Sequence, residues 1–398
     1  MRQSMPALKN KLYFNYGGQG PLPSQSLEAI KSSWEKIQEL GPFTNDVWPY
    51  IFNEISLTKQ SLSKICGVPQ RRLALTENVT SGCVLPIWGL PFTKSERILI
   101  SDCEHPGVVA ACRELAIRNH LHIDILSVRK FRDGINKQET TDELILRELK
   151  KSLTNKTKLV VISHILWNTG QIMPIDAIAK TITHYSSKPY LLVDAAQSFG
   201  QIPIASAASN SDIYAFTGHK WAFGPEGLGG LVISERVLHE SNPTLIGWKS
   251  LKKEESIYME NPNPFHVDAR RFEIATSCIP LLAGLRTSLN LLRKEGSETE
   301  RLQKIQGLSL KFWEGLSQIN GIRPILSGPP PTGLVSFSLS KENFEDSLVK
   351  FLGRKKLWIR VLEDPRWLRA CLHVTSNQEE IDILLSFIKD FSYKNINH

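Results

Sequence analysis

The sequence predicts an α/β fold built on a mostly parallel sheet, and three observations support this prediction. Runs such as "PYLLVD" are apolar throughout rather than alternating, as expected for strands buried on both faces. Segments with helical spacing, such as "ELILRELKKSL" and "IDAIAKTITHYSS", separate many of these runs. Polar residues repeatedly follow the runs at their carboxyl ends, where open α/β sheets bind ligands.

The expected elements follow one another along the chain. The first segment, to Pro23, is interpreted as an extended arm with Gly and Pro turns. A helix is expected over "SQSLEAIKSSWEKIQELG", with a serine cap at Ser24 and a terminal glycine, Gly41. The expected strands lie in "RLALTENV", "ERILISDCEHPG", "HIDILSV", "TKLVVISHI", "PYLLVDAAQ", "SDIYAFTGHK" and "GLGGLVIS".

The pattern changes after about Thr276. A long helix, "LLAGLRTSLNLLRKEG", leads to further helices and a few strands in "GLVSFSLS", "LWIRVL" and "LRACLHV". A chain of 398 residues is long enough for one large domain and a smaller one. We therefore expect a smaller α+β domain at the C-terminal end.

Composition narrows the classes of function. The hydrophobic content of 41% and charged content of 22% are those of a globular protein. The net charge of +8 is spread thinly and accompanies no recognition motif, so a nucleic-acid partner is not expected. No signal peptide and no run of about twenty apolar residues is evident, so no membrane association is expected. The six cysteines form no CxxC pair, which predicts no metal site and favours a reducing compartment, the cytoplasm.

The segment "YAFTGHKWAFGPEGLGG" places an amine in apolar surroundings. Lys220 follows an apolar strand, and burial would lower its pKa and make it nucleophilic, as a lysine that forms an imine requires. Thr217 and His219 could donate hydrogen bonds to a nearby phosphate. The alternative is an ordinary surface lysine.

Asp194 ends the apolar strand in "LLVDAAQ", with Gln197 three residues later. A carboxylate there could keep a ring nitrogen protonated by Coulomb attraction, or it could simply cap the next helix. The turn "ENVTSG" opens a helix whose amino terminus could bind phosphate; the alternative is a capping turn. His105 in "CEHPG" could stack on a planar ring or be a loop histidine.

Arg360 and Arg369 lie on expected strands of the smaller domain. Arginine clamps carboxylates through two parallel hydrogen bonds, although pairing with surface acids such as Glu363 would make them structural. Together the candidates describe one ligand, a planar phosphorylated pyridine aldehyde held through a lysine imine. That ligand is pyridoxal 5′-phosphate.

The ordered series "CEHPG", "SHILWNTGQIMPI", "VDAAQSFG", "FTGHKWAFGPEGLGGL" and "RRFEIAT" resembles the class V aminotransferase family over nearly the whole chain. Cysteine desulfurases, isopenicillin N epimerases and cystine C–S lyases belong to it, and "YFNYGGQGPLP" with "CEHPG" is most similar to the cystine lyases. The resemblance implies fold type I of the pyridoxal phosphate-dependent transferases, with a mostly parallel seven-stranded sheet. It also implies three parts: an arm (1–23) joining the small domain, a large cofactor-binding domain (24–280) and a small domain (281–398).

The resemblance also implies roles for the candidate residues. Lys220 would form the imine with the cofactor, Asp194 would pair with the pyridine nitrogen, and Gln197 would contact the ring hydroxyl. His105 would stack on the ring and assist proton transfer. The phosphate would be held by Val79 (through its backbone), Thr80, Thr217 and His219.

Substrate and subunit contacts are implied in the same way. Thr276, in "RFEIAT", would reach the phosphate of the neighbouring subunit, which implies a homodimer with two shared sites. Arg369 would bind the substrate carboxylate, and Arg360 would be a second substrate contact. The substrate mouth would be lined by Tyr16, Gly17, Gly18 and Gln19.

Two departures from the family pattern bear on the reaction. Cysteine desulfurases carry a persulfide-forming cysteine on a loop before the carboxylate-binding arginine, but this sequence has no cysteine between Ser347 and Ala370. Cys371 lies after Arg369 in an expected strand and is interpreted as a packed apolar residue. An asparagine near the ring is replaced by Trp167, with Asn168 next to it.

The expected reaction is therefore β-elimination on L-cystine, or L-cysteine. It would yield pyruvate, ammonia and cysteine persulfide or sulfide, because a persulfide is a good leaving group. The sulfur would pass to an acceptor or an iron–sulfur scaffold. The same site could instead serve a desulfurase-like enzyme, an aminotransferase or an amino-acid epimerase. A sulfur-binding scaffold without catalysis is the remaining alternative, against which the intact Lys220, Asp194, His219 and Arg369 argue.

Overall fold

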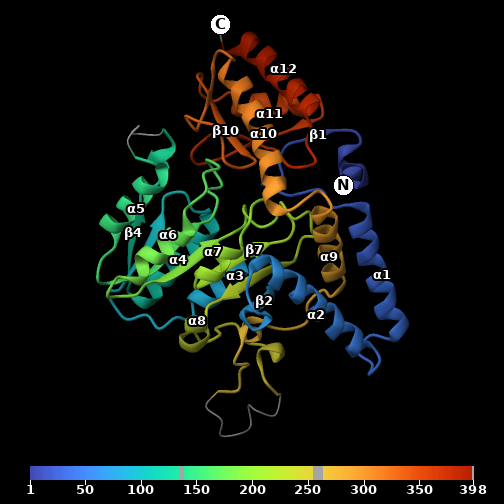
Figure 1. Ribbon diagram of the computed structural model, residues 1–398, viewed down its shortest axis with the longest axis vertical. Coiled ribbons are helices and arrows are strands. Elements are labelled where there is room, and N and C mark those ends of the chain that lie inside the picture. The colour runs from blue at the N-terminus through green and yellow to red at the C-terminus, as the bar shows by residue number, and fades with distance from the viewer. Residues whose placement is uncertain (134–138, 254–262, 397–398) are drawn as a thin grey trace.

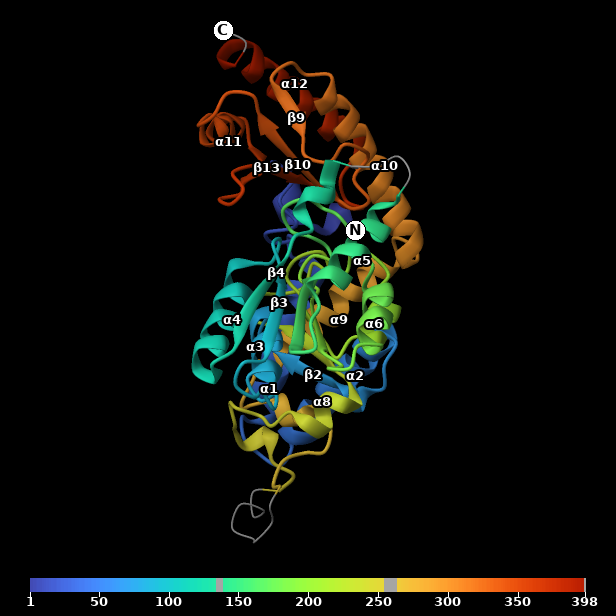
Figure 2. The ribbon, with the colours of Figure 1, turned by 90° about the vertical axis from the view of Figure 1, so that its left-hand side faces the viewer.

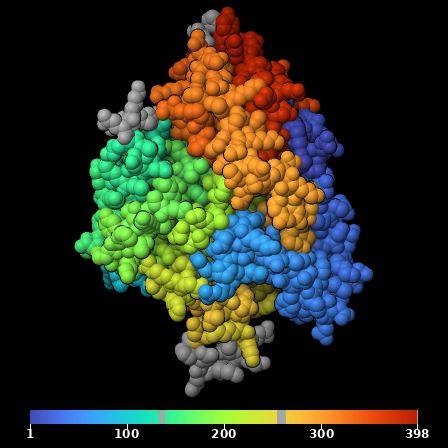
Figure 3. Space-filling view, viewed as in Figure 1, coloured from blue at the N-terminus to red at the C-terminus, as the bar shows by residue number. Residues whose placement is uncertain are grey.

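The computed structural model describes residues 1–133, 139–253 and 263–396 of the chain. Figure 1 shows two parts stacked along the longest axis, a lower body that holds a large sheet and an upper part built from the C-terminal elements. In the space-filling view the orange and red C-terminal residues cover the top of this body (Figure 3). Among the described residues, no helix combines the length and apolar character needed to cross a bilayer.

The large sheet has seven strands in the order β2-β8-β7-β6-β5-β3-β4. Its strands are β2 (Leu73–Thr76), β3 (Arg97–Ser101), β4 (His122–Leu126), β5 (Thr157–Ser163), β6 (Tyr190–Asp194), β7 (Ile213–Thr217) and β8 (Gly229–Ile233). Strand β8 is antiparallel to both of its neighbours, and the strands from β7 to β4 are parallel to one another. The prediction of an α/β fold with a mostly parallel sheet is confirmed.

Helices cover both faces of this sheet, which explains why its strands are apolar throughout. One face packs against α3 (Val79–Ile87), α4 (Pro106–Asn119) and α8 (Glu235–Glu240). The other face packs against α2 (Val47–Cys66), α5 (Thr141–Ser152), α6 (Ile175–Thr183), α7 (Ala205–Asn210) and α9 (Pro280–Arg293). Figure 2 shows α3 and α4 on one side of the sheet and α5 and α6 on the other.

Strand register brings the predicted polar residues to one edge of the sheet. Ser163 at the end of β5 pairs with Asp194 at the end of β6, and Asp194 pairs with Ala215 of β7. Because these strands are parallel, the residues that follow them emerge side by side. This is the edge at which open α/β sheets bind ligands.

The upper part holds a second sheet, antiparallel and four-stranded, in the order β12-β13-β10-β9. Its elements are β9 (Ile322–Pro324), β10 (Leu334–Leu339), β12 (Arg360–Val361) and β13 (Leu368–Cys371), with helices α10 (Glu298–Ser317), α11 (Glu345–Arg354) and α12 (Gln378–Asn395). The N-terminal arm joins this part, because β1 (Leu12–Tyr13) pairs with β11 (Leu357–Trp358) and Phe14 enters its core.

Three features differ from the expectations. Helix α1 (Ser24–Leu40) has Pro23 at its N-cap and no side-chain cap, so the expected serine cap at Ser24 is wrong: Ser24 is already the first helical residue. Helix α2 was not predicted. Helix α9, which the predicted boundary at residue 280 would separate from the large domain, packs against α1 and shares its core with the large sheet.

Candidate active site

Lys220 lies in the turn that follows β7, at the carboxyl edge of the large sheet. The turn is fixed by the Gly224 amide, which donates to Gly218 O (2.8 Å), and by the arm residue Gly20, whose amide donates to His219 O (2.7 Å). A Cβ at Gly20 would lie 2.1 Å from Lys220 O, so only glycine fits where the arm crosses this turn.

The electrostatic surroundings make Lys220 reactive. Burial lowers the pKa of its ammonium group to about 8, the carboxylate of Asp194 opposes this shift, and the guanidinium of Arg369 adds to it. At pH 7 roughly a tenth of the amine is therefore unprotonated, far more than for an unshifted lysine. This is the state in which a lysine attacks an aldehyde.

Asp194 ends β6 as a buried carboxyl group, 5% exposed. Its Oδ1 accepts a hydrogen bond from the Ala196 amide (2.8 Å), and the next helix, α7, begins only at Ala205, so Asp194 is not a helix cap. Burial raises the pKa of Asp194, and the Ala196 amide and Lys220 partly reverse that shift. A cationic ring nitrogen beside this carboxylate would be held protonated.

Gln197 connects this edge to the arm. Its Nε2 donates to Gly17 O (3.0 Å), and its Oε1 accepts from Trp221 Nε1 (2.8 Å). Gly17 approaches so closely that a Cβ there would lie 2.9 Å from Arg369 Nη2. The arm, the large domain and the C-terminal sheet therefore meet at one point.

Strand register also gathers four of the predicted phosphate contacts. Thr217 pairs with Gly229, which pairs in turn with Thr76 on β2, and a Cβ at Gly229 would lie 3.2 Å from the carbonyl carbon of Asn78. The amino terminus of α3, with Val79 and Thr80 in its first turn, therefore lies beside Thr217 and His219. Free amide groups of a helix terminus together with hydroxyl and imidazole groups suit a phosphate.

Side-chain hydrogen bonds order these groups. The Thr217 hydroxyl and His219 Nδ1 are 2.7 Å apart. Asn78 caps α3 by accepting a hydrogen bond from the Ser81 amide (2.9 Å). Desolvation, followed by the charge of Lys220, lowers the pKa of His219, so its ring is neutral at pH 7.

His105 lies at the N-cap of α4, and its Nδ1 accepts a hydrogen bond from the Gly107 amide (3.2 Å). Its ring meets the ring of Trp167 edge to face, with centroids 6.0 Å apart. Desolvation, followed by the charge of Lys220, lowers the pKa of His105. Because Nδ1 accepts the hydrogen bond from the Gly107 amide, the neutral ring carries its proton on Nε2.

Glu104 is a site residue that sequence reasoning missed. It is 6% exposed and accepts hydrogen bonds from the Ser163 amide (2.8 Å), the Ser163 hydroxyl (2.7 Å) and the Ser101 hydroxyl. Burial raises its pKa to about 7, and these hydrogen bonds limit the rise. Glu104 ties the ends of β3 and β5 together, and its position beside His105 in the polar turn after a strand could have indicated it.

A cavity of about 890 Å³ opens above these groups, lined by Gly17, Gly18, His105, Gln197, Lys220, Arg360 and Arg369 among others. Arg369, on β13, is 1% exposed, and its Nη1 donates to Trp167 O (2.7 Å). Arg360 pairs opposite it on β12 and is exposed. In the described part of the chain, neither arginine forms an ion pair with Glu363.

Unpaired polar atoms around this cavity test whether a cofactor and an amino-acid substrate fit it. Within the described residues, Trp167 Nε1, Asn168 Oδ1, and Nε and Nη2 of Arg369 are buried without a hydrogen-bond partner. A buried guanidinium with two free nitrogens is suited to a carboxylate, and unpaired buried groups are costly unless a ligand completes them. Together with Lys220, Asp194 and the amino terminus of α3, these atoms fit pyridoxal 5′-phosphate and an amino acid.

Two of the predicted mouth residues lie elsewhere. Tyr16 is 1% exposed, is hydrogen-bonded to Thr375 Oγ1 (3.0 Å) and packs between Trp221, Phe223 and His373, so its expected place in the substrate mouth is wrong. Gln19 points to the surface and bonds Glu226, away from the cavity. Their backbone neighbours Gly17 and Gly18 do line the cavity.

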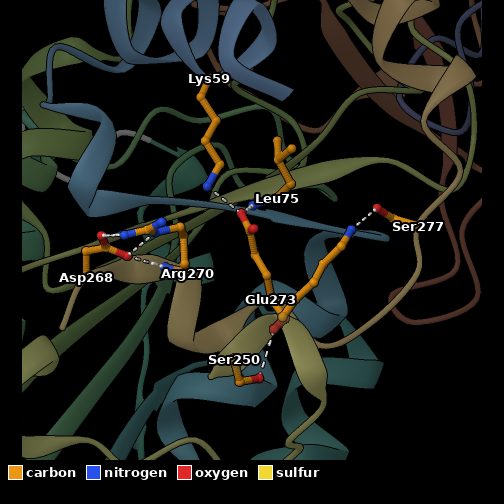
Figure 4. A network of polar contacts seen from close by, with 8 residues as sticks. Lys59, Leu75, Ser250, Asp268, Arg270, Glu273 and Ser277 are labelled. Carbon is orange, nitrogen blue, oxygen red and sulfur yellow. Dashed lines mark hydrogen bonds and ion pairs between the residues drawn. The ribbon is translucent and has the colours of Figure 1, made fainter. Parts of the chain in front are cut away.

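Thr276 is exposed, and within the described residues no hydrogen bond joins it to Thr217 or His219. The segment that carries it is nevertheless firmly anchored (Figure 4). Lys59 of α2 forms an ion pair with Glu273 (2.6 Å), whose Oε1 also accepts from the Leu75 amide (2.9 Å). Lys249 Nζ donates to Ser277 Oγ (2.9 Å) on the far side of Thr276.

Comparisons with known proteins identify the family and the structures that this chain resembles. The family model for aminotransferase class-V matches residues 46–384. A lysine-to-alanine mutant of C-DES, with glycine covalently linked to the pyridoxal phosphate cofactor, is 36% identical with a TM-score of 0.91, covering 98% of this chain and 99% of that one. The complex of the cystine C–S lyase C-DES with its reaction product cysteine persulfide is 36% identical with a TM-score of 0.90, covering 97% and 99%.

Curated relatives carry a related name. A probable cysteine desulfurase of Methanothermobacter thermautotrophicus is 24% identical to this chain, over 87% of this chain and 82% of the relative.

Proposed function

The chain belongs to the class V aminotransferase family, and we propose that it is a pyridoxal 5′-phosphate-dependent carbon–sulfur lyase that cleaves L-cystine by β-elimination. One water is consumed, and the products are pyruvate, ammonia and cysteine persulfide. The similarity to C-DES over nearly the full length of both chains supports this substrate.

The cofactor, bound through its aldehyde, supplies an electron sink that makes the α-hydrogen of an amino acid acidic. Arg369 binds the α-carboxylate of the substrate through its two free nitrogens and fixes the orientation of the α-carbon. Lys220, with its lowered pKa, accepts the α-proton. Asp194 keeps a proton on the ring nitrogen.

The same residues can assist the leaving sulfur. His105 carries its proton on Nε2, since Nδ1 accepts the Gly107 amide, and it lines the same cavity. It is therefore placed to donate to a sulfur atom that departs from the β-carbon. A persulfide needs little such help, which favours cystine over cysteine.

One observation carries the choice of lyase over desulfurase: among the described residues, no cysteine lines the cavity. Desulfuration needs an enzyme thiol to attack the substrate sulfur. Cys371, two residues after Arg369, is 0% exposed on β13, and the exposed Cys278 lies beside Glu273 in a separate pocket. Without that nucleophile, the electron pair left by the α-proton expels the β-sulfur instead.

Product analysis tests the proposal. Purified enzyme is incubated separately with L-cystine and L-cysteine, and pyruvate, persulfide and alanine are quantified. We expect pyruvate and persulfide from cystine and no alanine. Alanine from cysteine would identify a desulfurase, and the absence of any product would favour an aminotransferase or an epimerase. Lys220→Ala, which cannot form an imine with the cofactor aldehyde or accept the α-proton, is the inactive control.

We further infer that the enzyme is a homodimer with shared sites. An aromatic patch is exposed on one flank: Phe43 (85% exposed), Phe52 (63%) and Trp248 (43%) surround Trp48, with ring centroids 5.4–6.4 Å from it. A contiguous exposed patch of this kind favours an interface. Trp248 directly precedes Lys249, which anchors the Thr276 segment, so a second copy on this patch would bring its site close to Thr276.

The persulfide product also limits where the enzyme can act. Cysteine persulfide reacts with thiols, so a thiol acceptor or an iron–sulfur scaffold would consume it. All six cysteines are unpaired, which supports a reducing compartment such as the cytoplasm.

A further inference from the structure

The active-site cavity carries charged groups of both signs. Lys220 and Arg369 lie in its interior beside the buried Glu104, and they match the anionic groups of the cofactor and the substrate, whereas Arg113 and Arg360 are exposed at the rim. At the rim, the turn between β12 and β13 carries Glu363 and Asp364, both exposed and both lining the same cavity. In the described part of the chain, neither carboxylate is ion-paired or hydrogen-bonded.

The hairpin formed by β12 and β13 limits how far the acidic turn lies from Arg369. Arg360 lies directly opposite Arg369 in the antiparallel pair β12–β13, and the turn is closed by the Leu362 amide, which donates to Trp367 O (2.7 Å). Glu363 follows Arg360 by three residues and lies in the bend of this turn, so the chain separates the two by at most roughly 10 Å.

A disulfide substrate spans part of this distance. The α-carbons of two disulfide-linked cysteines lie about 5.5–6 Å apart. When Arg369 holds the carboxylate of the half that reacts, the α-carbon of the other half lies roughly one such length further out. A carboxylate side chain from the turn can reach an ammonium group at that distance.

We propose that Glu363 and Asp364 form a subsite for the α-ammonium group of the half of the disulfide that is not cleaved. This inference rests on the proposed lyase function and extends it. The ligand class is a disulfide of L-cysteine whose distal half carries a cation. The buried, unpartnered nitrogens of Arg369 anchor one end of the substrate, and the acidic pair selects the other end.

Disulfides of L-cysteine that lack one of the charged groups of the distal half test this subsite. Pyruvate formation is measured with three substrates. The first is L-cystine, and the second is the mixed disulfide of L-cysteine and cysteamine, which keeps the distal ammonium group. The third is the mixed disulfide of L-cysteine and 3-mercaptopropionate, which lacks that ammonium group. The double variant Glu363→Gln/Asp364→Asn is expected to lose about tenfold in kcat/KM on the first two substrates, since it removes two contacts at the rim. On the third substrate it should stay within about twofold of the native enzyme.

A matched control separates the subsite from overall charge. Glu314→Gln/Glu342→Gln removes two exposed carboxylates that do not line the cavity, and it should leave all three substrates unchanged. Equal losses on all three substrates, or no loss on cystine, would overturn the subsite while leaving the lyase intact. No pyruvate from any disulfide with native enzyme would instead overturn the proposed function, and the subsite with it. Unchanged cofactor absorbance and melting temperature confirm that the variants fold.

Discussion

At the scale of single residues, Lys220 is the group whose chemistry depends most on its surroundings. Its pKa of about 8 predicts that cofactor-free enzyme binds pyridoxal phosphate faster as the pH rises, with the rate levelling off above about pH 8. Only the unprotonated amine attacks the aldehyde, and an unshifted lysine would titrate near 10.4. The measurement is the growth of visible absorbance after mixing at a series of pH values.

Asp194→Asn provides the control for this pH dependence. The carboxylate of Asp194 raises the pKa of Lys220, so its removal should move the midpoint to lower pH. A rate that still increases tenfold per pH unit between pH 9 and 10 would contradict the lowered pKa.

Arg369 gives a second prediction at this scale. Arg369→Ala should lower kcat/KM for L-cystine by about 10²–10³, chiefly through KM, because hydrogen bonds to charged groups are worth about 1.5–3 kcal/mol each. Steady-state kinetics with cystine measures the change, and the exposed Arg354, which does not line the cavity, supplies Arg354→Ala as the control. A loss confined to kcat would show that Arg369 acts elsewhere than on the carboxylate.

Sequence reasoning reached the residues whose roles follow from where strands end. Lys220, Asp194 and Thr217 follow or end apolar strands, and the register of a parallel sheet then brings them together. It failed for Tyr16, because a tyrosine beside two glycines gives no indication of whether its ring faces a cavity or the core. It missed Glu104 because a buried carboxyl group depends on Ser101 and Ser163, which lie on two different strands.

At the scale of elements, the Lys59–Glu273 pair connects α2 to the segment that carries Thr276 (Figure 4). Its side chains are only 8% and 12% exposed, so Lys59→Met would leave a buried carboxylate unpaired. We expect a loss of about 3–5 kcal/mol in the free energy of unfolding, and weaker binding of pyridoxal phosphate as the segment loosens. Denaturant unfolding and cofactor titration measure the two effects.

Two further variants make this prediction specific. Lys59→Met/Glu273→Gln removes the unpaired charge and should recover part of the stability. Lys36→Met breaks the exposed pair with Glu39 and should change stability by less than about 1 kcal/mol. If Lys59→Met were as mild as Lys36→Met, the pair would not hold the segment.

The same region explains why α2 escaped prediction. Its buried face includes Glu54, Thr58 and Lys59, which are satisfied by Glu273 and by Arg286, the latter 2.7 Å from Glu54. Hydrophobic periodicity detects only apolar stripes. The polar part of this buried face, which interrupts the apolar positions Val47, Leu62 and Cys66, can be recognised only once its partners from distant parts of the chain are known.

At the scale of the whole molecule, the shared-site dimer predicts complementation between two inactive variants. Lys220→Ala removes the reactive amine, and Thr276→Asp places a negative charge against the phosphate. In a mixed dimer, one site combines an intact Lys220 with the intact Thr276 of the other subunit. Lyase activity should therefore reappear when the two variants are co-expressed. If subunits pair at random, half of the dimers are mixed, and one of the two sites in each mixed dimer is complete. The expected activity is then roughly a quarter of the native level. If Thr276 acts within its own subunit, the Lys220-bearing chain keeps its own Asp substitution and the mixture stays inactive.

The aromatic patch predicts how the dimer can be dissociated. Phe43→Asp/Phe52→Asp places two charges on exposed aromatic positions, which a self-complementary interface cannot bury without cost. Sedimentation should show the native enzyme as a dimer and this variant as a monomer with weakened cofactor retention, since each site would lose the Thr276 of its neighbour. Ile117→Asp, at a residue of α4 that is 70% exposed and outside the aromatic patch, should remain dimeric. A dimer that survived Phe43→Asp/Phe52→Asp would place the interface on another face and separate Thr276 from the shared site.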